Sequence, residues 1–572
     1  MNLSRKNLTM LFACGLSLSA QAGEREELLK LKNTTVNLID VLVKQGIIDK
    51  DKAEAMVRDA EARAGEEARR QVEAEKLQVE STVKGQAKGK FGHDPVRVTY
   101  VPDFVKDEIR QEVKKELRDE VVQDVKAHAK QEKWGIPAAL PDWVNRIRWT
   151  GDLRLRFEDQ FFGADNQAES YYDWPRINRT GGIAAPGLDP FRNSTIDRIR
   201  YRMRLRLGMD ANIGDGLKAG LRLATSNDRS PISINQTLGQ NGQQYELALD
   251  RAFLQYDYVD GKGHDWLTLL GGRYANPFLS SDNLYDQDMS FEGFSGTAHL
   301  PLPLGSGGTH KTPPPAGRQQ INMGLSNPNE VYMTLGFFPL QEVELSSHDK
   351  WMWGGQTGVD WVFMDDARIR TGIAYYDYDN IQALPNSLGS RRNDWSAPLF
   401  FTKGNSLAQI SNDGDINAEP RLVGLASDFN IVDAMVNLDY RAIGATHVML
   451  TGNYSRNLGF DQAQILRRTG KNISPRIDAW QVRIDVGHPE MHKFADWNVW
   501  LAYKYLERDA VLDAYTDSNF HLSGTDARGW FLSGSYGLAT NTWLNVRWLS
   551  TKAIDGPVFD TDVVLVDLNS RF

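Results

Sequence analysis

RIRYRMRLRLGMDANI, residues 198–213, places an arginine at every second position from Arg198 to Arg206, with apolar side chains between them. A period of two puts alternate side chains on opposite faces of a β-strand, whereas a helix would spread both sets around its circumference. Five arginines in a row cannot enter a dry core, because unpaired buried charge is too costly. The stretch therefore indicates either a half-exposed strand of a soluble sandwich or a membrane-barrel strand whose charged face meets water.

The composition leaves both classes open, and the N-terminus favours export. The 572-residue chain has a net charge of −9, and the charged lumen of a barrel would give similar averages to a soluble protein. Two basic residues precede the apolar run 8–18, and Ala20-Gln21-Ala22 follows it, so we expect a secretory signal peptide over residues 1–22. Its Cys14 is the chain's one cysteine, so the mature protein should lack disulfides. A lipoprotein signal ending at Cys14 is the less favoured alternative.

Residues 23–133 are expected to form a periplasmic helical region. A short heptad seam of leucines over 28–42 predicts a coiled coil, and apolar residues four apart over 105–125 predict a further helix. Glycines and prolines indicate a linker near 81–102. We interpret these helices as a stalk or oligomerisation segment, and the alternative is amphipathic helices that lie on another surface.

From residue 140 to the C-terminus at 572 the period changes to two, which predicts a mainly β, antiparallel transmembrane barrel of about 16 strands. Most candidates are about ten residues long, the length that a tilted strand needs to cross a bilayer. Short turns alternate with long loops, as expected of outer-membrane barrels. The connection 301–330 is long although it falls on the short-turn side, so it is either a periplasmic insertion or a miscounted strand. The strands are expected near 146–158, 197–213, 217–226, 247–258, 266–274, 290–300, 330–338, 351–363, 367–378, 432–441, 446–456, 479–488, 497–508, 526–538, 542–552 and 562–572.

Aromatic residues support the barrel interpretation. Six tryptophans have the apolar parity of their strands and could form an interfacial belt, although sandwich-core tryptophans would share this parity. The chain ends on Phe572, also on the apolar parity of its strand, which resembles the assembly signal that the barrel assembly machinery reads. The six tryptophans are Trp149, Trp353, Trp361, Trp480, Trp497 and Trp548.

Several segments carry a resemblance to one known family. They are VRVTYVPDFVKDEIRQEVKKEL from Val96, ALPDWVNRIRWTGDLRLRFE from Ala139, DKWMWGGQTGVDWVF from Asp349 and YKYLERDAVLDAYTDSNF from Tyr503. In this order, and followed by the terminal strand, they resemble the putative porin family of Gram-negative bacteria over nearly the whole mature length. The resemblance implies an integral outer-membrane barrel for diffusion of small solutes, a homotrimer, contact with outer-membrane lipid and lipopolysaccharide, and no catalytic residues.

A porin works through the width and electrostatics of a constriction, so the candidate site is a set of pore-lining charges. The basic wall expected on the inward faces of the first strands comprises Arg148, Arg154, Arg156, Arg198, Arg200, Arg202, Arg204, Arg206, Lys218, Arg222 and Arg251. The acidic residues expected at the loop between the fifth and sixth strands are Asp282, Asp286, Asp288 and Glu292. We hypothesise that this loop folds inward and faces the basic wall. The alternative is an external loop, with the arginines pairing locally to Asp152, Glu158 and Asp210.

The sequence thus predicts a water-filled channel for passive diffusion of small hydrophilic solutes. The alternatives are a channel specific for anionic solutes and a structural barrel whose N-terminal helices contact peptidoglycan. An enzyme is disfavoured, because G-x-S-x-G and H-E-x-x-H patterns are missing. A calcium loop at 413–419 lacks the complete motif, so we expect no metal and no cofactor. The negative net charge and the apolar second face of the arginine strand disfavour nucleic acid.

Overall fold

The computed structural model describes residues 146–180, 189–226, 230–303, 329–344, 346–414 and 422–572. The expected signal peptide, the helical region 23–133 and its linker lie outside these ranges. Most of the long connection 301–330 and of the acidic run 413–419 also lies outside them. None of the helices in the described ranges combines the length and the apolar character needed to cross a bilayer.

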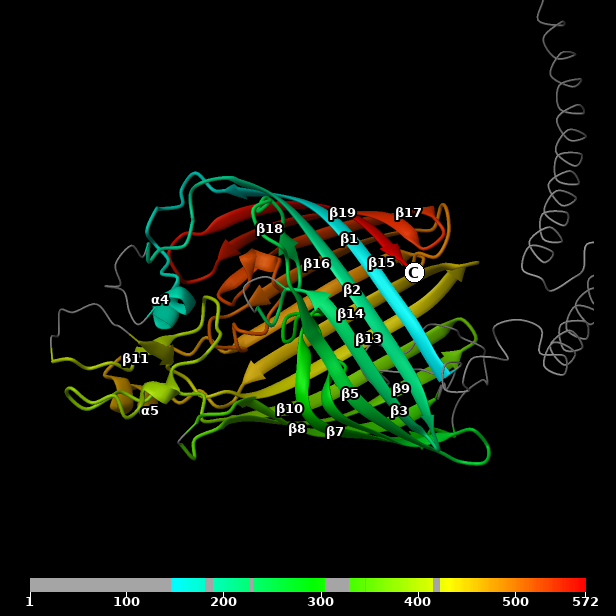
Figure 1. Cartoon of the computed structure of the whole chain (residues 1–572), viewed down its shortest axis with the longest axis horizontal. Helices are drawn as coiled ribbons and strands as arrows, with labels where there is room; N and C mark the ends of the chain where they lie inside the picture. Colours follow the sequence, from blue (N-terminus) through cyan, green and yellow to red (C-terminus); the bar gives the residue numbers. More distant parts are fainter. Residues whose placement is uncertain (1–145, 181–188, 227–229, 304–328, 345, 415–421) are drawn as a thin grey trace, which may run out of the picture. The chain divides into compact units, whose positions relative to one another are not determined.

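A closed antiparallel barrel forms the described part of the chain (Figure 1). Its sheet has 17 strands, and apart from the two-residue β4 (Gln236–Thr237) the remaining sixteen pair in chain order, with β19 closing onto β1. The predicted barrel and its strand number are confirmed. The crossing strands are β1 (Ile147–Phe162), β2 (Arg198–Gly214), β3 (Leu217–Thr225), β5 (Leu247–Val259), β6 (Asp265–Ala275), β7 (Ser290–Pro301), β8 (Glu330–Gln341), β9 (Lys350–Met364), β10 (Ala367–Asp379), β13 (Asn430–Ile443), β14 (Thr446–Asn457), β15 (Asp478–Gly487), β16 (Trp497–Leu506), β17 (Ala527–Ala539), β18 (Thr542–Ala553) and β19 (Asp560–Arg571).

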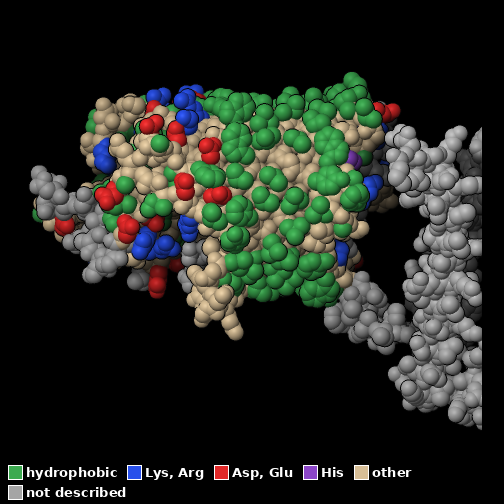
Figure 2. Space-filling view, turned by 90° about the horizontal axis from the view of Figure 1, so that it is seen from above, with side chains coloured by type: hydrophobic (Ala, Val, Ile, Leu, Met, Phe, Trp, Pro, Cys, Tyr) green, Lys and Arg blue, Asp and Glu red, His purple; other side chains and the backbone are tan. Residues whose placement is uncertain are grey.

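The two faces of the wall differ as the period-two pattern predicts. On β2, Ile199 and Tyr201 point outward and are 59% and 60% exposed, while the alternating arginines point inward. Figure 2 shows the result on the face in view, where hydrophobic side chains cover the middle of the wall and charged side chains gather toward its ends. Five of the six predicted belt tryptophans are exposed on this outer face, and Trp361 is half-buried. A dry sandwich core is therefore excluded for those five.

Apart from the long connection between β7 and β8, short turns lie at one end of the barrel and longer connections at the other. Between β2 and β3, Asp215 and Gly216 have φ of 51° and 82°, the positive values that a tight hairpin turn of the I′ kind requires. The C-terminus lies at this same end (Figure 1). The opposite end holds α4 (Trp174–Thr180), β11 (Leu407–Gln409) and α5 (Gln462–Thr469) (Figure 1). The long loops also contain the short elements η3 (Asp394–Ser396), β12 (Val423–Leu425) and η4 (Phe520–Leu522).

The seam between β1 and β19 ends on the C-terminal phenylalanine. The backbone N–H of Gly151 donates to the carbonyl of Phe572 at 2.8 Å, and the N–H of Phe572 donates back at 3.0 Å. The phenyl ring covers Gly151 so closely that a Cβ added there would lie 2.3 Å from Cε2 of the ring. The last residue therefore closes the barrel with both its backbone and its side chain.

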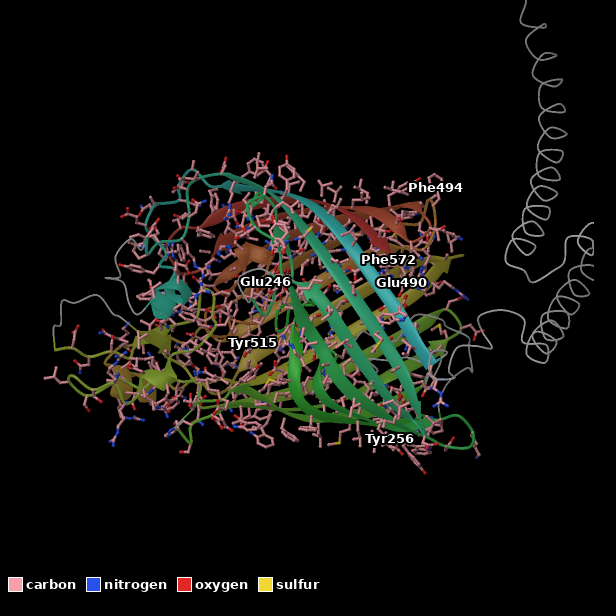
Figure 3. All side chains as sticks on the ribbon, in the orientation of Figure 1. Glu246, Tyr256, Glu490, Phe494, Tyr515 and Phe572 are labelled. Atoms are coloured by element: carbon pink, nitrogen blue, oxygen red, sulfur yellow. The ribbon has the colours of Figure 1, made fainter. Side chains whose placement is uncertain are left out.

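We expect Phe572→Ala to reduce the amount of folded barrel several-fold, because removal of the ring uncovers Gly151 and costs about 1–2 kcal/mol at the seam. The measurement is the heat-modifiable gel mobility of outer-membrane fractions. Phe494→Ala is the matched control, since Phe494 is similarly exposed at the same end of the barrel (Figure 3). Equal folded fractions for the two variants would contradict a role for Phe572 in assembly.

Candidate functional site

The basic wall occupies the inward faces of β1 and β2, and its like charges stand opposite one another. Arg154 pairs in register with Arg204, and Arg156 with Arg202. Like charges directly opposite on neighbouring strands destabilise a sheet unless counter-charges lie between them. The structure supplies those carboxylates from the same strands.

Asp152 on β1 bridges two of the arginines on β2. Its Oδ1 lies 2.9 Å from a guanidinium nitrogen of Arg204, and its Oδ2 lies 2.5 Å from Nε of Arg206. Arg154, on the other side of Arg204, has a different kind of partner, because it donates to the side-chain oxygen of Asn235. One carboxylate therefore serves two of these three guanidinium groups.

Glu158 on β1 also bridges two arginines of β2, nearer the long-loop end of the strand. It forms ion pairs with Arg200 and, at 3.3 Å, with Arg202. Across the seam, Asp567 on β19 accepts from Nε of Arg156 at 2.7 Å and from Arg547 on β18 at 2.5 Å. The wall is therefore a ladder of shared carboxylates in which cations outnumber anions.

Of the five remaining basic residues of the predicted site, Arg198 lines the inner side of the barrel toward the long loops, and the other four have partners on nearby strands. These are Arg148 with Asp210 at 2.7 Å, Lys218 with Asp257, Arg222 with Asp250, and Arg251, whose Nε donates to the Ser290 hydroxyl at 3.3 Å. Much of the wall thus follows the alternative of local pairing, including all three carboxylates named for it. His447, which sequence parity also places inward, lies 2.7 Å from Asp439.

Residues 276–289, here called the crossing loop, traverse the barrel interior between β6 and β7. The backbone N–H and carbonyl of Leu279 both bond to the side-chain amide of Gln356 on β9, and Ser281 contacts Asn453 on β14. Beyond them, the loop reaches β16 and β2. Strand β2 is far around the barrel from both β9 and β14, so a segment that touches all three must cross its inside.

The four predicted acidic residues have different partners. Asp288 lies 3.3 Å from Arg204 of the basic wall. Asp282 instead forms an ion pair with Lys504 on β16 at 2.8 Å, and Glu292 pairs with Arg273 on the neighbouring strand. Within the described residues, Asp288 is the one member of the acidic set in ion-pair contact with the basic wall.

The fourth, Asp286, fastens the crossing loop to a second inward loop between β16 and β17. Its N–H donates to the carbonyl of Tyr515 at 2.7 Å, and its Oδ2 accepts from the N–H of Ser518 at 2.7 Å. The N–H of Asp517 donates to the carbonyl of Asp282 at 3.0 Å. The sequence analysis did not single out this second loop, and it missed Lys504 and Asp517.

Burial and nearby charges shift the pKa values of the two acids at the tip of the crossing loop in opposite directions. Burial raises the pKa of Asp286, and the neighbouring carboxylates of Asp288 and Asp517 raise it further. Burial also acts to raise the pKa of Asp288, but Arg204 and Arg154 outweigh it and lower that pKa to about 2. Asp288 is therefore the carboxylate that stays charged beside the basic wall.

Aromatic side chains hold the crossing loop against the wall. The rings of Phe278 and Tyr376 on β10 meet edge to face, 5.1 Å between centroids. Tyr285 packs on Phe291 at 5.0 Å, and its hydroxyl lies 2.8 Å from that of Tyr378. Such contacts fix ring orientation beyond simple burial. The loop is thus anchored by an apolar cluster on one side and by ion pairs on the other.

Two hollows border these loops on the inner side of the barrel. The first, of about 490 Å³, is here called the basic vestibule, and it lies toward the long-loop end beside Glu158. Its charged lining has one acid, Asp173, and six bases, which are Arg179, Arg192, Arg198, Arg200, Arg202 and Lys403. The second, of about 260 Å³, is lined at the crossing loop by Arg154, Arg204, Asp288, Arg483, Asp517 and Arg547 among others.

No cluster of three or more side chains suited to a metal ion occurs among the residues that the structure describes.

Comparison with known proteins gives one family match and several similar solved structures. The family profile described as "Putative porin" matches residues 32–572. No curated protein sequence matches the chain. Similar solved structures include OprB of Pseudomonas putida at high pH (12% identity, TM-score 0.39, covering 77% of this chain and 97% of that one). A second is the outer membrane channel DcaP of Acinetobacter baumannii (10% identity, TM-score 0.36, covering 74% of this chain and 97% of that one). A third is an anion-selective porin from Comamonas acidovorans (11% identity, TM-score 0.35, covering 74% of this chain and 99% of that one). Since the profile spans nearly all of the sequence, the chain belongs to the putative porin family, a family of outer-membrane β-barrel channels.

Proposed function

We propose that the barrel is a water-filled channel for passive diffusion of small hydrophilic solutes, lined by the basic wall, narrowed by the crossing loop and selective for anions. The observation that carries the selectivity is the lining of the basic vestibule, with six basic side chains and one acidic one. Field lines focus in a water-filled cleft with low-dielectric walls, so this excess concentrates anions at the mouth.

The ion pairs of the basic wall do not neutralise this excess of positive charge. Glu158 is shared by Arg200 and Arg202, so one negative charge faces two positive ones. Arg179 and Arg198 form no ion pair with any part of the chain that the structure describes. Below the vestibule, Asp288 adds a negative charge at the crossing loop beside Arg204. A solute would thus pass from a basic mouth to a narrower zone of mixed charge.

We expect the purified protein in planar bilayers to conduct, with chloride about two- to tenfold more permeant than potassium at low salt. Reversal potentials under a KCl gradient measure this ratio. The preference should shrink toward 1 M salt, where the Debye length falls from about 10 Å at 0.1 M to about 3 Å. Liposome swelling with sugars and with organic anions compares the permeation of neutral and anionic solutes. A sealed bilayer would contradict the channel, and a cation preference would contradict the anion selectivity.

A further inference from the structure

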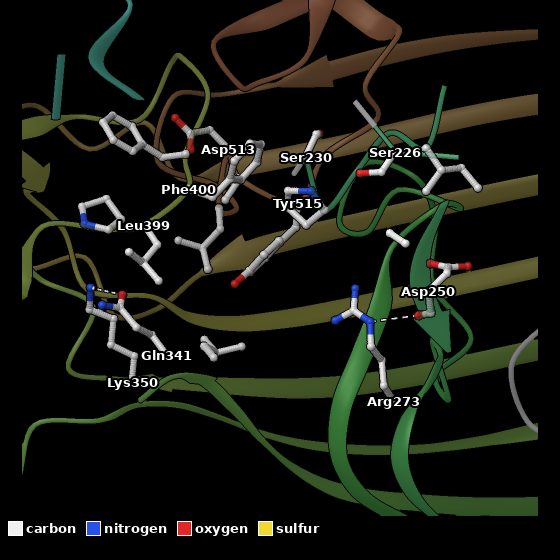
Figure 4. Close-up of a pocket in the computed structure, with 18 of the residues that line it drawn as sticks. Ser226, Ser230, Asp250, Arg273, Gln341, Lys350, Leu399, Phe400, Asp513 and Tyr515 are labelled. Carbon is white, nitrogen blue, oxygen red and sulfur yellow. Dashed lines mark hydrogen bonds between the residues drawn. The ribbon is translucent and has the colours of Figure 1, made fainter. Parts of the chain in front are cut away.

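A second kind of cavity opens beside the basic vestibule, and its walls are amphipathic. It has a volume of about 420 Å³ and lies among the loop ends of β5, β6, β8 and β9 and the long loops that fold over them (Figure 4). We call it the amphipathic pocket, defined by Arg273, Gln341, Lys350, Leu399, Phe400 and Tyr515. The size suits a small organic molecule, since ligand sites commonly span about 300–1,000 Å³.

One side of the pocket is apolar, which is unusual in a channel mouth lined by arginines. Leu399 is 73% exposed, and Phe400 and Tyr515 beside it are half-buried. Figure 4 shows Leu399 and Phe400 from one long loop and Tyr515 from another lining the same space. Apolar surface that faces water in a concave site favours a ligand with an apolar body.

A single uncompensated cation stands at one end. Lys350 is 4% exposed, and its ammonium donates to Oε1 of Gln341 at 2.8 Å and to the carbonyl of Ala397 at 3.0 Å. An ammonium has three N–H donors, and both partners here are neutral. No carboxylate lies at ion-pair distance from Lys350 in the described ranges. A buried cation without a counter-ion favours binding of an anion.

The other end of the pocket is already neutralised. Arg273 forms an ion pair with Glu292, and its Nε donates to the carbonyl of Asp250 at 2.9 Å. Asp250 in turn pairs with Arg222. The pocket therefore presents a cation without a counter-ion at Lys350, an apolar wall beside it, and a polar but balanced far end. Asp513 also lines the pocket, and its carboxylate accepts from the backbone N–H of Thr402 at 3.2 Å.

The pocket also adjoins the basic vestibule, and four residues line both hollows. They are Ser230, Leu399, Phe400 and Phe401. An anion concentrated in the vestibule is thus held next to the pocket.

We propose that the amphipathic pocket binds organic monocarboxylates with an apolar body, such as an aryl or a short alkyl chain. The carboxylate pairs with Lys350, and the body lies against Leu399, Phe400 and Tyr515. This deepens the proposed channel function by naming a class of anionic solute. Chloride or acetate would fill the charged end alone, and a neutral amide would fill the apolar wall alone, so neither matches both features.

The test uses 3-phenylpropionate as the probe, with 3-phenylpropionamide and acetate as its uncharged and truncated counterparts. Binding is measured by calorimetry on the full protein in detergent, and block of conductance is measured separately in bilayers. We expect Lys350→Gln to weaken binding of 3-phenylpropionate roughly tenfold, since one charge-assisted hydrogen bond is lost. Leu399→Ser should weaken it roughly threefold, because apolar contact is lost at an exposed position. Lys262→Gln is the matched control, an exposed lysine in the short turn between β5 and β6, and it should bind as the parent does.

The possible results test the binding site and the channel separately. Binding of the acid that exceeds that of the amide and of acetate, and that Lys350→Gln weakens, supports the site. Equal binding of acid and amide, no binding at all, or no effect of Lys350→Gln overturns it. Because calorimetry needs no conduction, a protein that binds but does not conduct would refute the channel and keep the site. A protein that conducts but does not bind the acid would support the channel and refute the site.

Discussion

Joint replacement of Arg202, Arg204 and Arg206 by glutamine is expected to turn the channel from anion to cation preference. The substitutions remove three positive charges and leave Asp152 and Asp288 without their main ion-pair partners. Arg154 and Arg222, which also act to lower the pKa of Asp288, remain in this variant. A unit charge about 4 Å from a permeating ion changes its energy by about 1 kcal/mol in water and by several-fold more at lower dielectric. The permeability ratio should therefore shift by at least roughly tenfold.

The measurement is again the reversal potential under a KCl gradient at low salt. A triple variant of Arg391, Arg392 and Arg467 to glutamine is the matched control, because it removes the same charge from exposed positions in the long loops. That control should keep the parent's preference within about twofold, since exposed charges beyond a Debye length are screened. If both triple variants behave alike, the arginines of β2 do not line the constriction.

The strands were predictable because alternation is a local property. The pattern in 198–213 indicates its own strand and both its faces, and β2 runs from Arg198 to Gly214. The first strand, expected to end at 158, continues to Phe162, because Gln160 and Phe161 keep the alternation of inward and outward side chains. Strand ends depend on where the neighbouring strand and loop stop pairing, which is not encoded within the strand itself.

The partners of the charges could not be predicted in the same way. Parity says that Arg156 points inward, but its carboxylate, Asp567, lies at the far end of the sequence and becomes a neighbour only when β19 closes onto β1. Lys504 offers a similar case. It alternates with tyrosines and reads as one more lumen residue, whereas its ion pairs depend on two loops that meet inside the barrel.

Lys504 and its two carboxylate partners, here called the ion-pair node, are the basis of the second prediction with a large expected effect. Its ammonium is fully buried, 2.8 Å from Asp282 of the crossing loop and 3.2 Å from Asp517 of the second inward loop. Lys504→Met removes the shared cation and leaves two carboxylates that face each other with little access to water. Breaking a buried pair in this way costs about 3–5 kcal/mol. Since both loops are tied to the wall here, we expect them to detach, with a lower unfolding temperature and a larger, fluctuating single-channel conductance.

Two comparisons separate loss of this node from a general effect of lost charge. Lys552→Met is the matched control, because Lys552 is exposed on β18 and pairs with Asp560 at 2.7 Å, so the same substitution should cost about 0.2–1 kcal/mol and leave conductance unchanged. Adding Asp282→Asn and Asp517→Asn to Lys504→Met removes the stranded negative charges, and the unfolding temperature should rise again toward that of the parent. A Lys504→Met channel as quiet and as stable as the Lys552→Met channel would mean that the aromatic cluster around Phe278 and Tyr376 holds the crossing loop without the ion pair.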